Sequence, residues 1–164
     1  MKHLLALNEW IGRAVAWLTL AMVLVTLTIV VARYGFSIGS IAVQESVTYL
    51  HGIVFMLGAA YALRHDQHVR VDIFYREFTK RRKAWVDFLG VLFLLLPTCA
   101  YILLVSTDYV AAAWQVREGS REAGGLPLVY LLKTLIPITA LLVAFEGILI
   151  AVARARFILT GRRA

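Results

Sequence analysis

Four stretches with little or no charge, each 18 to 20 residues long, constrain the fold of this chain more than any other feature. They cover residues 14–32, 46–63, 88–107 and 134–153, and only the last contains a charged residue, Glu146. A helix needs about 20 mostly apolar residues to cross the hydrocarbon core of a bilayer. The sequence therefore predicts an all-α integral membrane protein in which residues 1–164 form one domain with four transmembrane helices.

Composition supports a membrane environment and weakens the case for nucleic-acid binding, which a basic chain would otherwise suggest. Only 16% of the residues are charged, against about 25% in a typical soluble domain, so the apolar excess must face lipid or other chains. The net charge of +7 lies in the gaps between the apolar stretches, which argues against nucleic acid as a partner. The single cysteine, Cys99, excludes an internal disulfide, and its apolar neighbours predict a buried side chain.

The distribution of Lys and Arg predicts the orientation of the helices. Four spans place both termini and the connection between spans two and three on one side, which carries thirteen basic residues against four on the other. The positive-inside rule then places both termini in the cytoplasm. The start of the chain, MKHLLALNEW, is expected to begin a retained helix, because the apolar stretch behind it is too long for a secretory signal and no cleavage site follows.

The connection after span two contains the basic stretch HVRVDIFYREFTKRRKAWVDF, residues 68–88. Asp72 can cap a short amphipathic helix in which Ile73, Phe74 and Phe78 share one apolar side. We expect this helix to lie flat in the interface, with membrane lipid as its partner; the alternative is a solvated loop. His68 is expected to be interfacial, because its spacing from His65 is a weak metal signal.

The third and fourth helices are predicted to be longer than the membrane is thick. The third can extend from residue 88 towards 116, and the fourth can begin near 126, with Pro127 in its first turn. We expect them to stand above the outer face as a hairpin. Its tip has mixed charge and is either a docking site for a soluble partner or a solvated loop without one. The candidate docking residues are Arg117, Glu118, Arg121 and Glu122.

The fourth span has two distinct faces. Ala140, Ala144, Gly147 and Ala151 form a seam of small residues that suits close helix packing. Glu146 lies roughly 130° around the helix from that seam, so the fourth helix is expected to have two neighbours, one of them possible in another chain. An acid inside a span is costly and is a functional candidate. Two roles stay open for Glu146, namely a hydrogen bond across an interface and the transport of a coupling proton.

Span two contains one histidine, His51, on the face that also carries Phe55, Gly58 and Ala62. We expect a packing role for it, because a haem held by two histidines would need a second membrane histidine. The sequence contains no phosphate loop, nucleophile arrangement, dinucleotide fingerprint or metal-ligand set. We therefore expect no enzyme activity, no cofactor and no metal. Four spans without an internal repeat leave little room for a self-sufficient carrier, which favours a subunit of a larger assembly.

From residue 33 onward, several short motifs occur in a recognisable order. They are RYGF at 33–36, Glu45, LGAAYALR at 57–64, HVRVD at 68–72 and GGLPLVYLLKTLIP at 124–137. In this order and spacing, over about 130 residues, the chain resembles the small membrane subunit (small permease, DctQ-like) of tripartite ATP-independent periplasmic (TRAP) transporters.

The resemblance implies a bacterial inner-membrane complex with a division of labour. A periplasmic binding protein captures a small organic anion, often a carboxylate, and a large membrane subunit moves it inward by an ion-driven elevator motion. The small subunit scaffolds the large one and helps dock the binding protein. The resemblance also implies structural roles for four residues at matching positions, Glu45, Gly58, His68 and Asp72. Glu45 is expected to pair with Arg33, Gly58 to allow close helix approach, and Asp72 to cap the interfacial helix.

Two other functions compete with this interpretation. One is a self-sufficient, dimeric, proton-coupled exporter of four spans that uses Glu146. The other is a membrane anchor for a redox enzyme, against which the small number of membrane histidines argues. Transport by the purified chain alone would favour the exporter, whereas a haem absorbance band would favour the anchor.

Overall fold

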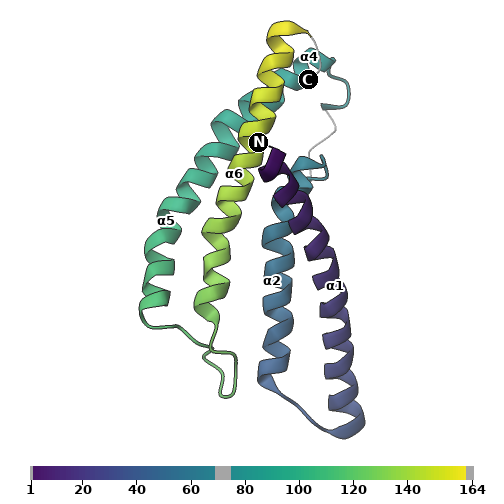
Figure 1. The fold of residues 1–164 in the computed structure, drawn as a ribbon, viewed down its shortest axis with the longest axis vertical. Helices are drawn as coiled ribbons and strands as arrows, with labels where there is room; N and C mark the ends of the chain where they lie inside the picture. The colour runs from purple at the N-terminus through teal and green to yellow at the C-terminus, as the bar shows by residue number, and fades with distance from the viewer. Residues whose placement is uncertain (1, 69–74, 162–164) are drawn as a thin grey trace.

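The computed structural model describes residues 2–68 and 75–161, and this part of the chain is helical throughout its regular structure (Figure 1). The helices are α1 (Lys2–Phe36), α2 (Ile41–Arg64), α4 (Lys80–Gly90), α5 (Leu96–Gln115) and α6 (Val129–Thr160). A single π-helical segment, η1 (Val91–Leu95), joins α4 to α5, so that these three elements continue as one helix.

The prediction of four membrane-spanning helices is confirmed for the described residues. Four helices are long and apolar enough to cross a membrane, namely Trp10–Phe36, Ile41–Arg64, Lys80–Gln115 and Val129–Thr160. The third and fourth contain 36 and 32 residues, which at 1.5 Å per residue correspond to about 54 Å and about 48 Å. Both are longer than a hydrocarbon core of about 30 Å, as the sequence predicts.

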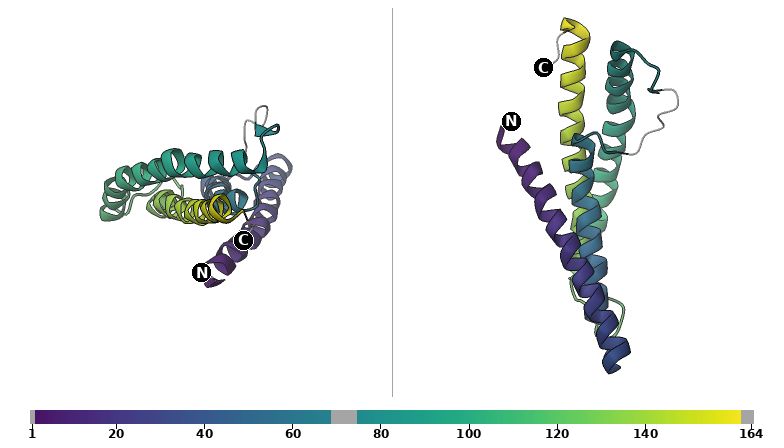
Figure 2. Two further views of the ribbon diagram at one scale, coloured as in Figure 1. Left: turned by 90° about the horizontal axis from the view of Figure 1, so that it is seen from above. Right: turned by 90° about the vertical axis from the view of Figure 1, so that its right-hand side faces the viewer.

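The four helices form an open row and not a closed bundle. α1 packs against α2, α2 packs against α6, and α6 packs against the long α4–α5 helix. Figure 2 shows this order from above, with α1 and α4–α5 at the two edges. α2 and α6 therefore hold the molecule together, because each has a neighbour within the chain on both sides.

Both described ends of the chain lie toward the same end of the row, as an even number of crossings requires (Figures 1 and 2). We call this the terminal end; it contains residues 65–68, 75–90 and 153–161. The loops 37–40 and 116–128 lie at the opposite end, which we call the loop end. The side of the membrane on which each end lies stays a prediction.

The excess length of the long helices differs from the predicted outer hairpin. The third helix extends to Gln115 at the loop end, as predicted, but it also begins at Lys80, and α6 continues to Thr160. These two extensions pack together at the terminal end (Figure 1). The start of α6 is corrected as well. It begins at Val129, so Pro127 lies in the loop before the helix.

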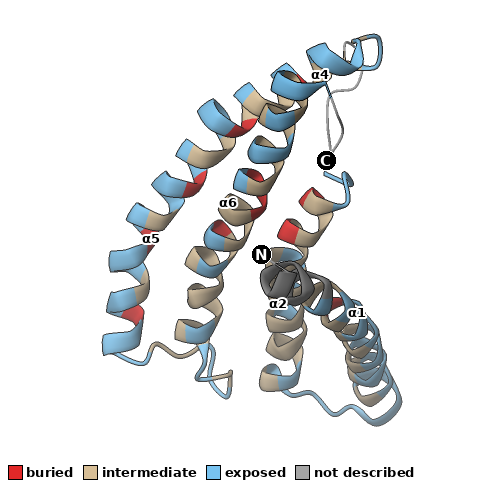
Figure 3. Ribbon diagram, turned by 45° about the horizontal axis from the view of Figure 1, so that its top comes forward, coloured by how far each residue is buried: buried red, intermediate tan, exposed pale blue. Residues whose placement is uncertain are grey.

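The core that joins the helices is thin and is made mainly of small residues. Buried side chains lie on the sides of α2, α5 and α6 that face neighbouring helices (Figure 3). They include Ala60, Ala113, Ala140 and Cys99, so the predicted burial of the cysteine is confirmed. Small side chains let helix backbones approach closely, which is the main way in which helices pack inside a membrane.

Three glycines make the closest helix approaches. A Cβ atom at Gly12 would clash with the ring of Tyr61 where α1 crosses α2. At Gly52 it would lie 2.9 Å from Leu132 Cδ1 of α6, and at Gly147 it would lie 2.5 Å from Leu95 Cδ2 of η1. A larger side chain at any of these positions would force the contacting side chain of the neighbouring helix to shift.

The wide turn of η1 lies directly before Pro97. The backbone N–H of Leu96 donates to the carbonyl of Val91, five residues back. Proline has no N–H group and cannot donate to the preceding turn. A π-turn beside a proline lets the helix continue where a regular hydrogen-bond pattern is interrupted, and this is the place where Gly147 of α6 packs.

Candidate functional site

At the loop end, the carboxylate of Glu45 binds the loop between α5 and α6. The hydroxyl of Ser120 donates to Glu45 Oε1, and the backbone N–H of Leu126 donates to Oε2 at 2.6 Å. We call Glu45, Ser120, Gly125 and Leu126 the Glu45 cluster. A Cβ atom at Gly125 would lie 2.8 Å from Glu45 Oε1, so this position needs glycine for the carboxylate to reach the loop. The cluster ties the start of α2 to a segment about 80 residues later.

The predicted pairing of Glu45 with Arg33 is wrong. Arg33 is exposed in the last turn of α1, and no ion pair joins it to Glu45 in the described part of the chain. The physical reason is that the loop of residues 116–128 brings a backbone N–H and a hydroxyl to the carboxylate. Charged hydrogen bonds of this kind are the strong ones in proteins.

The loop is also closed by its own hydrogen bonds. The N–H of Ser120 donates to the carbonyl of Leu126 at 3.0 Å, and the N–H of Gly125 donates to the carbonyl of Glu122 at 3.0 Å. The N–H of Glu122 donates to Ser120 Oγ at 3.1 Å. Gly124 has a φ of 80°, a conformation that glycine adopts without strain. The tip is therefore an ordered loop with a defined shape.

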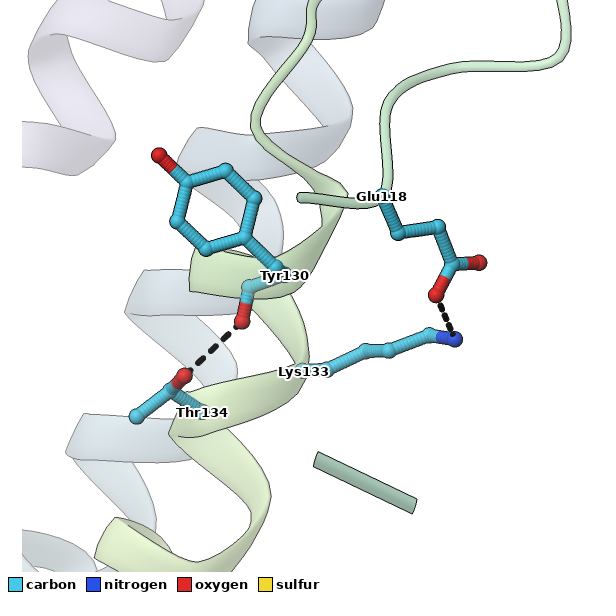
Figure 4. Close-up of polar contacts among 4 residues, drawn as sticks. All are labelled: Glu118, Tyr130, Lys133 and Thr134. Atoms are coloured by element: carbon cyan, nitrogen blue, oxygen red, sulfur yellow. Dashed lines mark hydrogen bonds and ion pairs between the residues drawn. The ribbon is translucent and has the colours of Figure 1, made fainter. Parts of the chain in front are cut away.

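A second set of contacts closes the base of this hairpin (Figure 4). Lys133 Nζ of α6 forms an ion pair with Glu118 Oε2 at 2.5 Å and lies 3.9 Å from the centre of the Tyr109 ring. On the other side, the indole N–H of Trp114 donates to Thr134 Oγ1 at 2.9 Å. The Thr134 hydroxyl in turn donates to the carbonyl of Tyr130 at 2.8 Å.

These contacts separate the four candidate docking residues into one that is engaged within the chain and three that are exposed. Glu118 is half-buried and engaged by Lys133 within the chain. Arg117, Arg121 and Glu122 are exposed, so they are the members of the set that a soluble partner can reach. Docking at this loop stays a prediction for these three residues.

The small-residue seam of α6 lies inside the molecule. Ala140 and Gly147 are buried, whereas Ala144 and Ala151 are half-buried. Glu146 is also buried, with 3% of its surface exposed. α6 packs against α2 on one side and against α4–α5 on the other. The two neighbours that the sequence predicts for α6 are therefore both present within this chain, and the burial of Glu146 needs no second copy.

The other candidates in α2 and the following connection have little contact with the core. His51 is exposed on α2, where its ring stacks on that of Phe55 with the ring centres 6.3 Å apart. A Cβ atom at Gly58 would be in ordinary contact with Val15 Cγ1, at 3.7 Å, so this position does not make the closest approach between α1 and α2. His68 is exposed.

The predicted interfacial helix lies mostly outside the described residues, together with its capping residue Asp72. At its described end, the N–H of Phe78 donates to the carbonyl of Tyr75 at 3.2 Å. Among the residues that the structure describes, no group of three or more His, Cys, Asp or Glu side chains is arranged to hold a metal ion.

At the terminal end, Asp87 connects three segments, and the sequence alone did not reveal this. Its carboxylate forms an ion pair with Arg154 of α6 at 2.9 Å and accepts the Tyr75 hydroxyl at 2.9 and 3.0 Å. Lys83 Nζ donates to the carbonyl of Arg76 at 3.3 Å and lies 5.1 Å from the centre of the Tyr75 ring. One feature of the sequence could have indicated a role for Asp87. It is the acid nearest to the basic run Lys80–Lys83 on the same helix.

Comparison with known proteins gives one family. A family model described as "Tripartite ATP-independent periplasmic transporters, DctQ component" matches residues 22–157, which includes the second and third spans, most of the fourth and slightly more than half of the first. A comparison with curated proteins finds no match.

Proposed function

Since the chain belongs to the DctQ component family of TRAP transporters, of which it is the small membrane subunit, we propose that it is a non-catalytic scaffold for a large, ion-coupled membrane subunit. In this proposal the large subunit moves the substrate by an elevator motion, and the small subunit enlarges the static part of the complex. A periplasmic binding protein delivers the substrate, for which a small organic anion, a carboxylate above all, is the expected class.

The open row of helices is the observation that carries this proposal. A closed bundle would surround its own core, whereas this row (Figure 2) leaves large apolar side chains exposed on all four spans, where lipid and a partner can cover them. Buried residues in the described part of the chain are few and small. A chain built in this way offers a surface, which suits a framework subunit better than a carrier with its own solute pathway.

The edge helix α1 provides the best candidate surface for the large subunit. It packs against α2 alone among the helices, apart from minor contacts. Its exposed side carries Trp17, Leu20, Leu24, Leu27 and Val31, with exposed fractions from 48% to 73%. Val23 and Val30 are exposed beside them, so the apolar surface of α1 is broad. Residues spaced by three and four within this surface can pack against a helix of a partner in knobs-into-holes fashion.

The same proposal assigns the two ends of the row to the two sides of a bacterial inner membrane. The terminal end, with the basic residues of α4 and the end of α6, faces the cytoplasm. The loop end faces the periplasm, where the binding protein arrives. Arg117, Arg121 and Glu122 are exposed there and offer both signs of charge, which suits weak and reversible docking.

Co-purification tests the scaffold proposal. The tagged chain is co-expressed with the large membrane subunit of its transporter, and the mass of the detergent-solubilised complex is measured. We expect a stable complex of both subunits, and substrate uptake into vesicles only when both subunits and the binding protein are present. Recovery of the small chain alone, or uptake by the small chain alone, would contradict the proposal.

A matched pair of variants tests the role of α1. Leu24→Asn places an amide on the proposed contact side, whereas Leu104→Asn makes the same change on the exposed side of α5 at the other edge. Helix association inside a membrane depends on close van der Waals packing, and Asn does not fill the space that Leu occupies. Leu24→Asn should therefore lower recovery of the large subunit by about fivefold. Leu104→Asn should leave it unchanged. Equal recovery of the large subunit with both variants would show that its contact surface does not lie on α1.

Family membership does not support the self-sufficient exporter as an alternative. The burial of Glu146 between helices of this chain favours an interhelical role for its carboxyl group. Replacement of Glu146 by Gln should therefore affect the stability of the chain before it affects any coupling step.

A further inference from the structure

A hollow of about 520 Å³ opens at the terminal end between α4 and the last turns of α6. Three cationic side chains line it, Lys80 and Lys83 from α4 and Arg154 from α6. Tyr75 and Phe157 add two aromatic rings, and Asp66 is the acid among the lining residues. The lining is therefore basic on balance, and it combines charged groups with apolar surface.

Contacts within the chain hold two of the three cations, Lys83 and Arg154. Lys80 and Lys83 lie one turn apart on the same side of α4. Lys83 is held near Tyr75 through its contact with the carbonyl of Arg76. Asp87 neutralises Arg154 through their ion pair, but neither lysine has a carboxylate partner among the described residues. Two lysine charges thus line the hollow without an ion-pair partner in the described part of the chain.

A second, apolar hollow of about 440 Å³ begins at Asp87 and follows the long helix as far as Ile102. It is lined by Val91, Leu94, Leu95, Thr98 and Ile102, with Val143 of α6 opposite. Lys80, Lys83 and Asp87 are spaced at three and four residues, and this spacing continues through Val91, Leu94 and Thr98. The basic and apolar hollows therefore follow one face of one helix, with the Asp87–Arg154 ion pair between them.

We propose that this groove binds an anionic phospholipid of the surrounding membrane. The phosphate lies against Lys80 and Lys83, and one acyl chain follows the apolar hollow past Leu94 and Ile102. A small soluble anion would need the cations but not the apolar hollow, whereas a helix of a partner would need the hollow but not two uncompensated lysines. A phospholipid uses both, with charge at the membrane surface and hydrocarbon below it, as basic sites beside transmembrane helices do.

Lipid binding to the full-length chain in detergent tests this proposal. Native mass spectrometry compares a phosphatidylglycerol with a phosphatidylcholine of the same acyl chains. Each basic residue that contacts an anionic headgroup is worth about a fivefold change in affinity. Lys80→Gln combined with Lys83→Gln should therefore weaken phosphatidylglycerol binding by about 30-fold, and phosphatidylcholine binding should be weak throughout.

The same helix provides a matched control. Arg81 and Arg82 are exposed and line neither of the two hollows, so Arg81→Gln combined with Arg82→Gln removes the same charge without touching the site. This control should weaken binding by less than about threefold, because charges that do not contact the lipid are screened by salt. Lys80→Arg combined with Lys83→Arg keeps the charge and should retain binding, which shows that loss in the Gln variant is not a folding defect.

Three results would overturn the proposal. Equal weakening in the two Gln variants would show that net charge alone attracts the lipid. Equal binding of the two phospholipids would show that the cations do not select the headgroup. Displacement of phosphatidylglycerol by an excess of inorganic phosphate, with no effect of acyl-chain length, would show that the hollow is an anion site that makes no use of the apolar groove.

Discussion

The loop end and the terminal end of the molecule differ in how they use their charged groups. At the loop end, counted together with the helix ends beside it, bases and acids are nearly equal in number: Arg33, Arg117, Arg121 and Lys133 against Glu45, Glu118 and Glu122. Several of these bind each other or the backbone within the chain. At the terminal end, the run Lys80–Lys83 exceeds the nearby acids, and the lysines lack ion-pair partners among the described residues.

This difference indicates what each end is suited to contact. A loop whose polar groups are satisfied internally keeps one shape, and it can present Arg117, Arg121 and Glu122 to a soluble protein without first becoming ordered. An end with excess positive charge is attracted to the anionic cytoplasmic leaflet. In our proposals, the loop end is thus suited to docking of a soluble protein, and the terminal end is suited to contact with a charged membrane surface.

The two ends keep a fixed arrangement only if α6 packs firmly against η1 in the middle of the molecule. Substitution of Gly147 provides the strongest test of this packing. A Leu side chain at this position would overlap Leu95 and Val91 of η1. Overpacking of a close contact costs about 1–3 kcal/mol, so Gly147→Leu should lower the thermal unfolding midpoint of the detergent-solubilised protein.

Gly90→Leu is the matched control, because the space around a Cβ atom at Gly90 is open. It should leave the unfolding midpoint unchanged or raise it slightly through better helix propensity. Equal destabilisation by the two variants would mean that α6 and η1 do not pack as closely as the structure shows.

A smaller and more local effect is expected at the loop end from Glu45→Gln. The substitution removes the charge that Ser120 and the Leu126 N–H bind, so the loop should open more often. Trypsin cleavage after Arg121 should then become faster by about tenfold, since cleavage of a local segment follows its open population. Asp108→Asn also removes a carboxylate charge at an exposed position, but on α5 and away from the loop, and it should leave the rate near that of the unmodified protein.

The smallest effect is expected at the terminal end from Asp87→Asn. This change removes the ion pair with Arg154, whose side chain is 43% exposed, and such pairs contribute less than about 1 kcal/mol. The loss of stability caused by Asp87→Asn should become smaller at high salt, because salt already screens the ion pair in the unmodified protein. Asp108→Asn, on the exposed side of α5, serves as the control. A greater loss of stability from Asp87→Asn than from Glu45→Gln would contradict our expectation that charged contacts stabilise the loop end more than the terminal end.

The sequence predicted the spans well, because a bilayer imposes a one-dimensional requirement for about 20 apolar residues. The third helix also reached Gln115, close to the predicted end near 116. The seam on α6 was predictable for a similar reason, since the spacing of Ala140, Ala144 and Gly147 is a property of one helix. No partner needs to be known to find such a pattern.

Contacts between distant segments were not predictable from the pattern. Glu45 and Leu126 are 81 positions apart, and the sequence gives no reason to prefer a loop N–H over the basic Arg33 nearby. Gly12 and Gly52 were missed because their importance depends on Tyr61 and Leu132, which face them only once the helices have packed. Short-range signals favoured Gly58, where the neighbouring helix is farther away.

The opposite placement of the two ends across the membrane is the central claim, and site-specific labelling tests it most directly. In a protein whose Cys99 is replaced by Ala, a single cysteine is introduced at Arg121 of the loop end or at Arg81 of the terminal end, both exposed positions. A membrane-impermeant maleimide is then added to cells with a permeable outer membrane. We expect Arg121→Cys to react in intact cells and Arg81→Cys to react only after the inner membrane is broken. The reverse pattern, or reaction of both cysteines in intact cells, would contradict the claim.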